Sequence, residues 1–185
     1  MFRAITRKIA LTCLVICCNV AALWLTYFLV SRRQSRPAVM AAAPSINEPA
    51  VGSEASDFVL PEVDGKTVAL SSLRGRPLIL GFFCGCDRCH AAARRIAEWQ
   101  RHGKLKDFVA VIALDRREAR QFQHDTGLHS ILLTDPSDQT AISYDSDNCP
   151  RLWQVSATGE ILQRSDPALQ GRMLDDTLAR LATRQ

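Results

Sequence analysis

The chain has 185 residues, and its net charge of +4 is unevenly distributed. Residues 1–49 carry six basic side chains and one acidic side chain, whereas residues 50–185 carry 17 basic and 18 acidic side chains. Because the positive excess is confined to the leader, the overall charge does not support nucleic-acid binding. A hydrophobic content of 47% with 23% charged residues excludes a disordered chain. The part that follows the leader is long enough for one domain with a substantial core.

An uncharged apolar run of 22 residues, from Ile9 to Val30, dominates the leader. A helix of this length spans a bilayer core of roughly 30 Å. The run exceeds the roughly 7–15 apolar residues of a cleavable signal peptide, and arginines follow it where a cleavage site would stand. We therefore expect a short basic N-terminus over 1–8, an uncleaved transmembrane anchor over 9–30, a flexible linker over 31–54 and a folded domain over 55–185.

Predicted strands and helices alternate along this domain. A hairpin is expected over 57–60 and 67–70, where Asp64-Gly65 supplies the turn, and a helical turn follows at 71–75. Continuous apolar runs predict buried strands at 77–83, 108–114 and 130–134. Helices are predicted over 87–102 and 117–126, and a second hairpin over 152–157 and 160–163.

The last helix is predicted to start with Asp166 as its N-cap and Pro167 in its first turn. Its apolar residues recur at helical spacing: Leu169, Met173, Leu174, Leu178 and Leu181. The order of elements predicts an α/β fold with a central mixed sheet flanked by helices.

The chemistry of the sequence concentrates in Cys86 and Cys89, a C-x-x-C between a buried strand and a helix. A helix N-terminus has unpaired N–H groups and a partial positive charge, which stabilise a thiolate. Thiolates are the attacking species in disulfide exchange, and Arg88 and His90 offer accessory cationic support. We expect Cys86 to attack a substrate disulfide and Cys89 to resolve the mixed disulfide.

The stretch SDFVLPEVDGKTVALSSLRGRPLILGFF, the C-x-x-C and a second block, CPRLWQVSATGEI over 149–161, together resemble the redoxin family. This branch of the thioredoxin superfamily spans alkyl hydroperoxide reductase/thiol-specific antioxidant proteins and membrane-tethered thiol–disulfide oxidoreductases. The resemblance covers roughly residues 55–185 and implies a thioredoxin-like fold. It also implies that Pro150 is cis and lies beside the C-x-x-C, where Pro150 and Cys149 would contact the substrate chain.

The sequence departs from the family pattern at three places. Gly85 precedes the first active-site cysteine where an aromatic residue is usual. Gly81 stands where thioredoxins proper have a buried Asp that accepts a proton, so the acceptor for Cys89 is unassigned. Asp87-Arg88 separates the cysteines in place of the usual Gly-Pro or Pro-Pro pair.

Two further cysteines, Cys84 and Cys149, are expected near the same site. We favour small apolar packing residues for both. The alternative is a four-thiol cluster, in which they either relay a disulfide or complete a metal or iron–sulfur site.

Three other functions compete with disulfide exchange. A peroxidase is disfavoured because the peroxiredoxin hydroxyl, three residues before the reactive cysteine, is replaced by Phe83. Haem attachment is suggested by the C-x-x-C-H spacing with His90, although the strand before the motif argues against it. A non-catalytic metal-binding module would use the four cysteines or His90. The remaining histidines show no ligand spacing and are expected on the surface: His102, His124 and His129.

We therefore expect a membrane-tethered thiol–disulfide oxidoreductase. Its partners would be protein dithiols or disulfides and an upstream electron donor or acceptor, with no cofactor and no nucleic acid. Three basic residues flank each side of the apolar run, so charge does not fix its orientation. Disulfide chemistry favours a cell-membrane protein with an extracytoplasmic domain.

Overall fold

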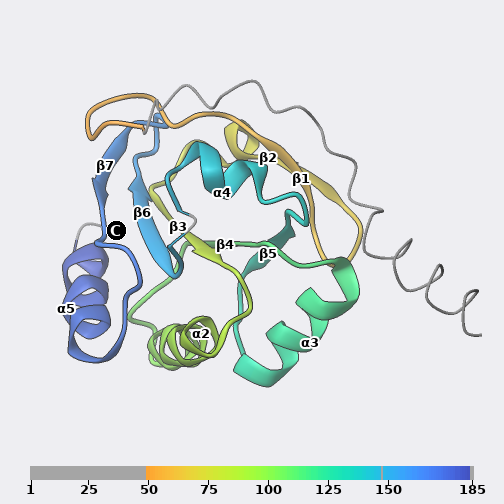
Figure 1. Ribbon diagram of the computed structural model, residues 1–185. Helices are drawn as coiled ribbons and strands as arrows, with labels where there is room; N and C mark the ends of the chain where they lie inside the picture. Colours follow the sequence, from red (N-terminus) through yellow and green to blue (C-terminus); the bar gives the residue numbers. More distant parts are fainter. Residues whose placement is uncertain (1–48, 147, 184–185) are drawn as a thin grey trace, which may run out of the picture. The chain divides into compact units, whose positions relative to one another are not determined.

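The computed structural model describes residues 49–146 and 148–183, and a five-stranded sheet lies at the centre of this part (Figure 1). The strand order is β5–β4–β3–β6–β7, in which β3, β4 and β5 are parallel and β6 is antiparallel to both β3 and β7. The strands are β3 (Leu78–Phe83), β4 (Phe108–Ile112), β5 (Ile131–Thr134), β6 (Arg151–Val155) and β7 (Ile161–Arg164). The predicted mixed sheet is thus confirmed.

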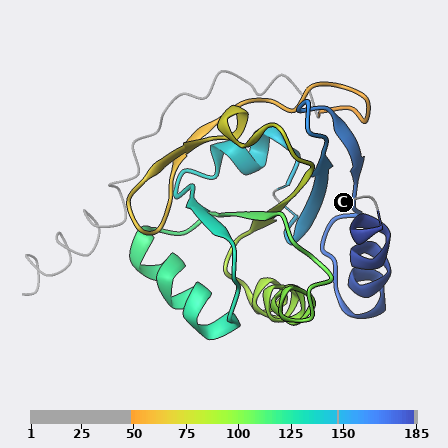
Figure 2. The ribbon, with the colours of Figure 1, turned by 180° about the vertical axis from the view of Figure 1, so that it is seen from behind.

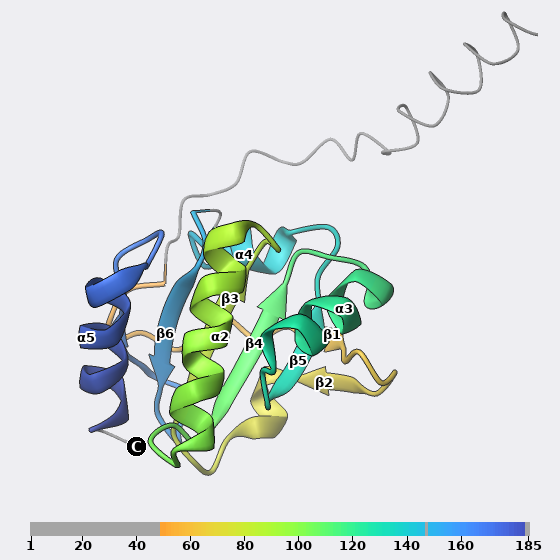
Figure 3. The same ribbon diagram turned by 90° about the horizontal axis from the view of Figure 1, so that it is seen from below.

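Three helices cover one face of the sheet, as Figure 3 shows from below. They are α2 (Asp87–Arg101), α3 (Arg116–Thr126) and α5 (Gly171–Ala182). The opposite face carries the hairpin of β1 (Val59–Pro61) and β2 (Thr67–Ala69), the 3₁₀ turn η1 (Leu70–Leu73) and the short helix α4 (Gln139–Ser143). Figure 2 shows this three-layer arrangement from behind. A thioredoxin-like α/β architecture follows.

Alternate side chains of β3 enter different cores because successive residues of a strand point to opposite faces. Ile79 and Phe83 pack under the helices with Ile96 of α2, whereas Leu80 and Phe82 pack under the hairpin side. All six residues of β3 are buried. The central strand is therefore fixed from both faces, and the loop that follows it starts from a rigid position.

The C-terminal end of α3 agrees with the sequence prediction, whereas its N-terminal end lies one residue earlier, at Arg116. Asp115 is the N-cap and forms a capping box with Glu118, and Gly127 closes the helix with a φ of 67°. Such caps satisfy N–H and carbonyl groups that the helix itself leaves unpaired.

The predicted start of the last helix is wrong. The helix α5 begins at Gly171, and its N-cap is Gln170, four residues after the predicted N-cap Asp166. The intervening backbone instead supports the loop before β6: the Ala168 N–H donates to the Asn148 carbonyl at 2.9 Å. Ala168 has a φ of 55°, which is incompatible with a continuous right-handed helix. Met173, expected in the apolar stripe, is 48% exposed.

No helix within 49–146 and 148–183 is long and apolar enough to cross a membrane. The predicted anchor over 9–30, the basic N-terminus and nearly all of the linker lie outside the described residues.

Candidate active site

The strand β3 delivers the C-x-x-C to the start of α2, as predicted. Cys86 is the N-cap of α2, with an extended backbone, and its carbonyl accepts the N–H of His90 at 2.9 Å. Cys89 lies in the first turn and is fully buried, whereas Cys86 is half-buried. Both are free thiols. The more exposed sulfur is thus the one at the helix end.

The loop between β3 and α2 depends on Gly85. This residue has a φ of +77°, in the left-handed region that favours glycine. A Cβ atom at this position would also lie 2.8 Å from Cδ1 of Leu114. Backbone conformation and close packing together explain why no aromatic side chain stands before Cys86.

The pKa values of the two thiols are shifted in opposite directions. Burial on its own would raise the pKa of Cys86, but the N–H and thiol of Cys89, followed by the N–H and charge of Arg88, lower this pKa overall. The Cys86 side chain makes no capping hydrogen bond, so the N–H dipoles act on its sulfur electrostatically. Burial chiefly raises the pKa of Cys89 to about 12, against opposing N–H groups of Cys84 and Gly85. The Cys86 thiol is therefore the more acidic of the two, and Cys89 holds its proton more firmly.

Gly81 has no room for the carboxylate that thioredoxins proper carry at the matching position. A Cβ atom on Gly81 would lie 2.5 Å from Cζ of Phe108 and 3.0 Å from Cε2 of Phe83. Real Cβ atoms essentially never approach another atom so closely. Aromatic packing thus replaces the buried acid at this site.

The loop before β6 contains the expected cis peptide bond between Cys149 and Pro150. Two backbone hydrogen bonds hold this loop: Ala168 donates to Asn148 at 2.9 Å, and Leu169 donates to Pro150 at 3.2 Å. Leu169 is itself fully buried. The segment before α5 therefore fixes the proline loop.

Arg151 is a further support of this loop that the sequence analysis missed. Its guanidinium donates to the Asp145 carboxylate at 2.6 Å and to the Asp145 carbonyl, and it lies 5.3 Å from the Trp153 ring centroid. Only 7% of its side chain is exposed. A charged residue that opens an otherwise apolar strand is the sequence signal for such a contact.

A disulfide joins Cys84 to Cys149. The register of β3 and β6 explains this pairing, because Phe82 lies opposite Arg151 and Cys84 lies opposite Cys149 when the register is continued by two residues. Their Cα atoms are 6.3 Å apart, a usual separation for a disulfide. The apolar-packing interpretation that we favoured for both cysteines is therefore wrong. Spacing along the chain could not reveal the pair without the strand register.

The disulfide lies against the free thiols. The Cys84 sulfur is 3.7 Å from the Cys89 sulfur, and the Cys84 N–H donates to the Cys89 sulfur at 3.3 Å. All four sulfurs lie within 4.8 Å of one another. Such a cluster offers four ligands to a soft metal ion only after the disulfide is reduced. In the described state it contains one disulfide and one dithiol.

The accessory residues fall into two groups. Arg88 contributes to the low pKa of Cys86, as anticipated. His90 turns toward α3, where its ring meets Phe122 at a centroid distance of 4.7 Å. The three other histidines are exposed, in agreement with the sequence prediction.

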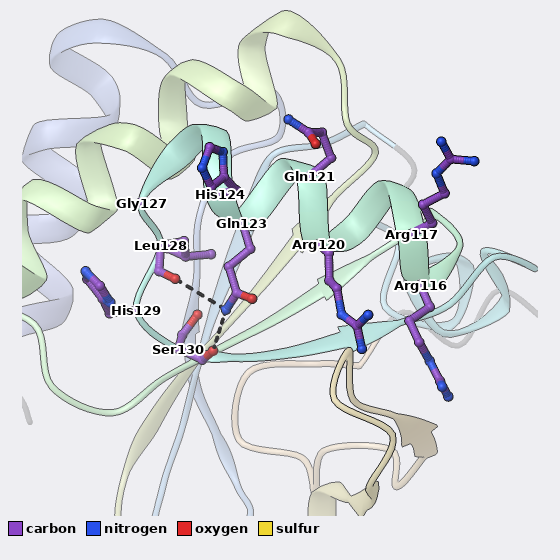
Figure 4. A pocket seen from close by; sticks show the side chains of 10 residues that line it. All are labelled: Arg116, Arg117, Arg120, Gln121, Gln123, His124, Gly127, Leu128, His129 and Ser130. Carbon is purple, nitrogen blue, oxygen red and sulfur yellow. Dashed lines mark hydrogen bonds between the residues drawn. The ribbon is translucent and has the colours of Figure 1, made fainter.

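A surface hollow lies along α3, and Figure 4 shows it. None of the four cysteines lines it. The three labelled arginines of α3, Arg116, Arg117 and Arg120, point in different directions rather than converging on one point (Figure 4). Its lining residues are Arg116, Arg117, Arg120, Gln121, Gln123, His124, Gly127, Leu128, His129 and Ser130. The sulfur cluster thus lies outside this hollow.

The sequence and the fold are similar to those of known proteins. The thiol-disulfide oxidoreductase ResA of Bacillus subtilis (strain 168) is 26% identical over 144 residues, which are 75% of this chain and 78% of ResA. A thiol-disulfide oxidoreductase from Bacteroides fragilis is 27% identical, with a TM-score of 0.56 over 69% of this chain and 98% of its own. The peroxidoxin BcpB from Mycobacterium tuberculosis has a TM-score of 0.63 over 74% and 97% of the two chains, but 15% identity, and shows the fold alone. The AhpC/TSA family profile matches residues 51–164, and the chain belongs to this family.

Proposed function

We propose that this protein is a thiol–disulfide oxidoreductase in which Cys86 and Cys89 exchange a dithiol for a disulfide with partner proteins. One observation carries the proposal: a half-buried thiol with a lowered pKa caps α2, and a buried thiol with a raised pKa lies beside it. The named activity of ResA agrees with this assignment.

The sulfurs suit a two-step exchange. The Cys86 thiolate attacks one sulfur of a partner disulfide, so that a mixed disulfide forms and the other partner sulfur leaves as a thiolate. The Cys89 thiol then loses its proton to solvent or to the departing thiolate and attacks the Cys86 sulfur. The partner leaves as a dithiol, and Cys86 and Cys89 are joined. The reverse sequence oxidises a partner.

The proline loop would hold the partner chain beside Cys86. Cys149 places this loop within 4.8 Å of the Cys86 sulfur, measured between the two sulfurs. Arg151 and the 168–169 backbone keep the loop in place from behind. An extended partner segment next to Pro150 would present its disulfide to Cys86 without rearrangement of the domain.

The location of the protein forms a second part of the proposal. The apolar run over 9–30 would anchor the chain in the cell membrane by a single helix, and the linker over 31–54 would separate the domain from the bilayer. An extracytoplasmic domain is proposed because stable disulfides such as Cys84–Cys149 persist in oxidising compartments. Protease accessibility of the domain in intact cells and in permeabilised cells tests this orientation.

Trapping tests the exchange mechanism. A Cys89→Ser variant should accumulate mixed disulfides with partner proteins through Cys86, because the resolving thiol is absent. The control is the Cys86→Ser/Cys89→Ser variant, which should trap nothing. Failure of the single variant to trap a protein disulfide, although its Cys86 is recovered as a free thiol, would overturn the proposal. Rapid consumption of hydrogen peroxide without turnover of a protein disulfide would identify a peroxidase instead.

A further inference from the structure

A second redox couple lies in contact with the proposed catalytic one. The Cys84–Cys149 disulfide is 3.7 Å, measured at the Cys84 sulfur, from the free thiol of Cys89. The thiol of Cys86 is within 4.8 Å of both disulfide sulfurs. A disulfide and a dithiol at this separation are the reactants of thiol–disulfide exchange.

The disulfide also occupies the place that the proposed function gives to a substrate. Cys149 directly precedes Pro150 in the loop that faces Cys86, and β3–β6 pairing fixes this position. The sheet therefore holds the internal disulfide beside Cys86, whereas a partner disulfide would first have to diffuse there and bind. Such preorganisation replaces a bimolecular encounter with an intramolecular one.

We propose that the Cys84–Cys149 disulfide is an internal substrate of the Cys86–Cys89 dithiol, so that the domain passes electrons between two cysteine pairs. This inference rests on the proposed function and adds a second couple to the same site. Reduction of both pairs would allow one domain to hold four electrons.

The exchange balances without an external oxidant or reductant. The Cys86 thiolate attacks the Cys149 sulfur, a Cys86–Cys149 bond forms, and the Cys84–Cys149 bond breaks with Cys84 leaving as a thiolate. The Cys89 thiol loses its proton to Cys84, and its sulfur then attacks the Cys86 sulfur. A Cys86–Cys89 bond forms, and Cys149 leaves as a thiolate that takes up the proton held by Cys84, so that the negative charge stays on the exposed Cys84 sulfur. The first pair is oxidised and the second is reduced by the same two electrons.

Burial favours this assignment of roles. Cys84 is exposed and Cys149 is 5% exposed, so a thiolate that leaves at Cys84 is solvated, whereas one at Cys149 is not. Exposure also makes Cys84 the sulfur through which a solution partner would collect or supply electrons. Partners in solution would thus react with the Cys86–Cys89 pair through Cys86 and with the Cys84–Cys149 pair through Cys84.

The rate of reduction of Cys84–Cys149 tests the inference. The full-length chain, fully oxidised, is mixed with one equivalent of dithiothreitol, quenched with acid at successive times and alkylated. Peptide mass mapping then gives the redox state of each pair. We expect reduction of Cys84–Cys149 to be at least about tenfold slower in the Cys86→Ser/Cys89→Ser variant than in the wild type. Equal rates would overturn the inference.

A second measurement detects the intermediate directly. In the Cys89→Ser variant, kept free of partners, we expect a peptide in which Cys86 is joined to Cys149 while Cys84 is alkylated. Exclusive recovery of the Cys84–Cys149 peptide would overturn the inference.

Turnover of an external protein disulfide by the wild-type chain separates the two proposals. If the wild type turns over the external disulfide but Cys84–Cys149 is reduced at the same rate in the wild type and in the Cys86→Ser/Cys89→Ser variant, the internal exchange is excluded and the proposed function stands. Absence of external turnover by the wild type would contradict the proposed function itself.

Discussion

The two cysteine pairs of the active site differ in how the chain brings their sulfurs together. Cys86 and Cys89 are placed by one turn of α2, whereas Cys84 and Cys149 are 65 residues apart and meet because β3 and β6 pair. The local pair is thus set by the helix turn rather than by strand pairing. The long-range pair ties the loop after β3 to the proline loop. Reactivity should therefore depend on the first pair and global stability on the second.

The largest expected effect is on reactivity. We expect Cys86→Ser to slow the reduction of a protein disulfide by at least about 1000-fold, because the remaining thiol in the turn, Cys89, has a pKa of about 12 and is almost entirely protonated at pH 7. Thiol release from the protein substrate measures the rate. Retention of most of the activity by this variant would show that the reactive sulfur belongs to the other pair.

Stability should respond in the opposite way. The Cys84→Ala/Cys149→Ala variant should lose about 4 kcal/mol in its free energy of unfolding, since a cross-link over 65 residues restricts the unfolded chain strongly. Urea denaturation under non-reducing conditions measures this loss. Cys86→Ser is the matched control, and its unfolding free energy should change by no more than about 0.5 kcal/mol. Equal losses in the two variants would contradict the distinction between the pairs.

The geometry of the local pair should depend on the glycine in its loop. We expect Gly85→Ala to lower the free energy of unfolding by about 1–3 kcal/mol more than Gly103→Ala. Both glycines have a positive φ, 77° at Gly85 and 66° at Gly103. An added Cβ would lie 2.8 Å from Cδ1 of Leu114 at position 85, whereas at position 103 it would meet no atom within 4 Å. Thermal or urea denaturation of the two variants gives the difference. Identical destabilisation would mean that backbone strain alone matters at Gly85.

The smallest expected effect is a shift in the pH dependence of the exchange rate. Because the pKa of Cys86 is lowered, the exchange rate should rise with pH and reach its plateau below the ordinary thiol range. Arg88→Gln removes one stabilising charge from the thiolate, so the rise should move to higher pH by less than about one unit. Arg94→Gln, an exposed arginine farther along the same helix, is the control and should leave the profile in place. A shift toward lower pH in Arg88→Gln would contradict the electrostatic role of this residue.

The sequence predicts the local pair well because its determinants are local. The apolar run before Cys84 can only be a buried strand, and the C-x-x-C at its end coincides with the start of α2. Glycine signals were equally direct, since Gly127 ends α3 in the left-handed conformation. The cis bond at Pro150 came from the resemblance to the redoxin family, and it is confirmed.

The features that the sequence did not predict depend on contacts between distant segments. Asp166-Pro167 has the composition of a helix start, yet the backbone that follows bonds to the proline loop, and α5 starts later. The helix α4 has five residues and no apolar period to reveal it. The Cys84–Cys149 bond requires the register of β3 and β6, which no single-segment pattern contains.

That register has a consequence for the order of events during folding. Cys84 faces Cys149 only when β3 and β6 are aligned in the native way, since a slip of one residue would place Asn148 or Pro150 opposite Cys84. In an unfolded chain, entropy favours short loops, so Cys84–Cys86 and Cys86–Cys89 bonds would form first. Appearance of the Cys84–Cys149 bond in a newly made chain therefore records that the centre of the sheet has been assembled in the correct alignment.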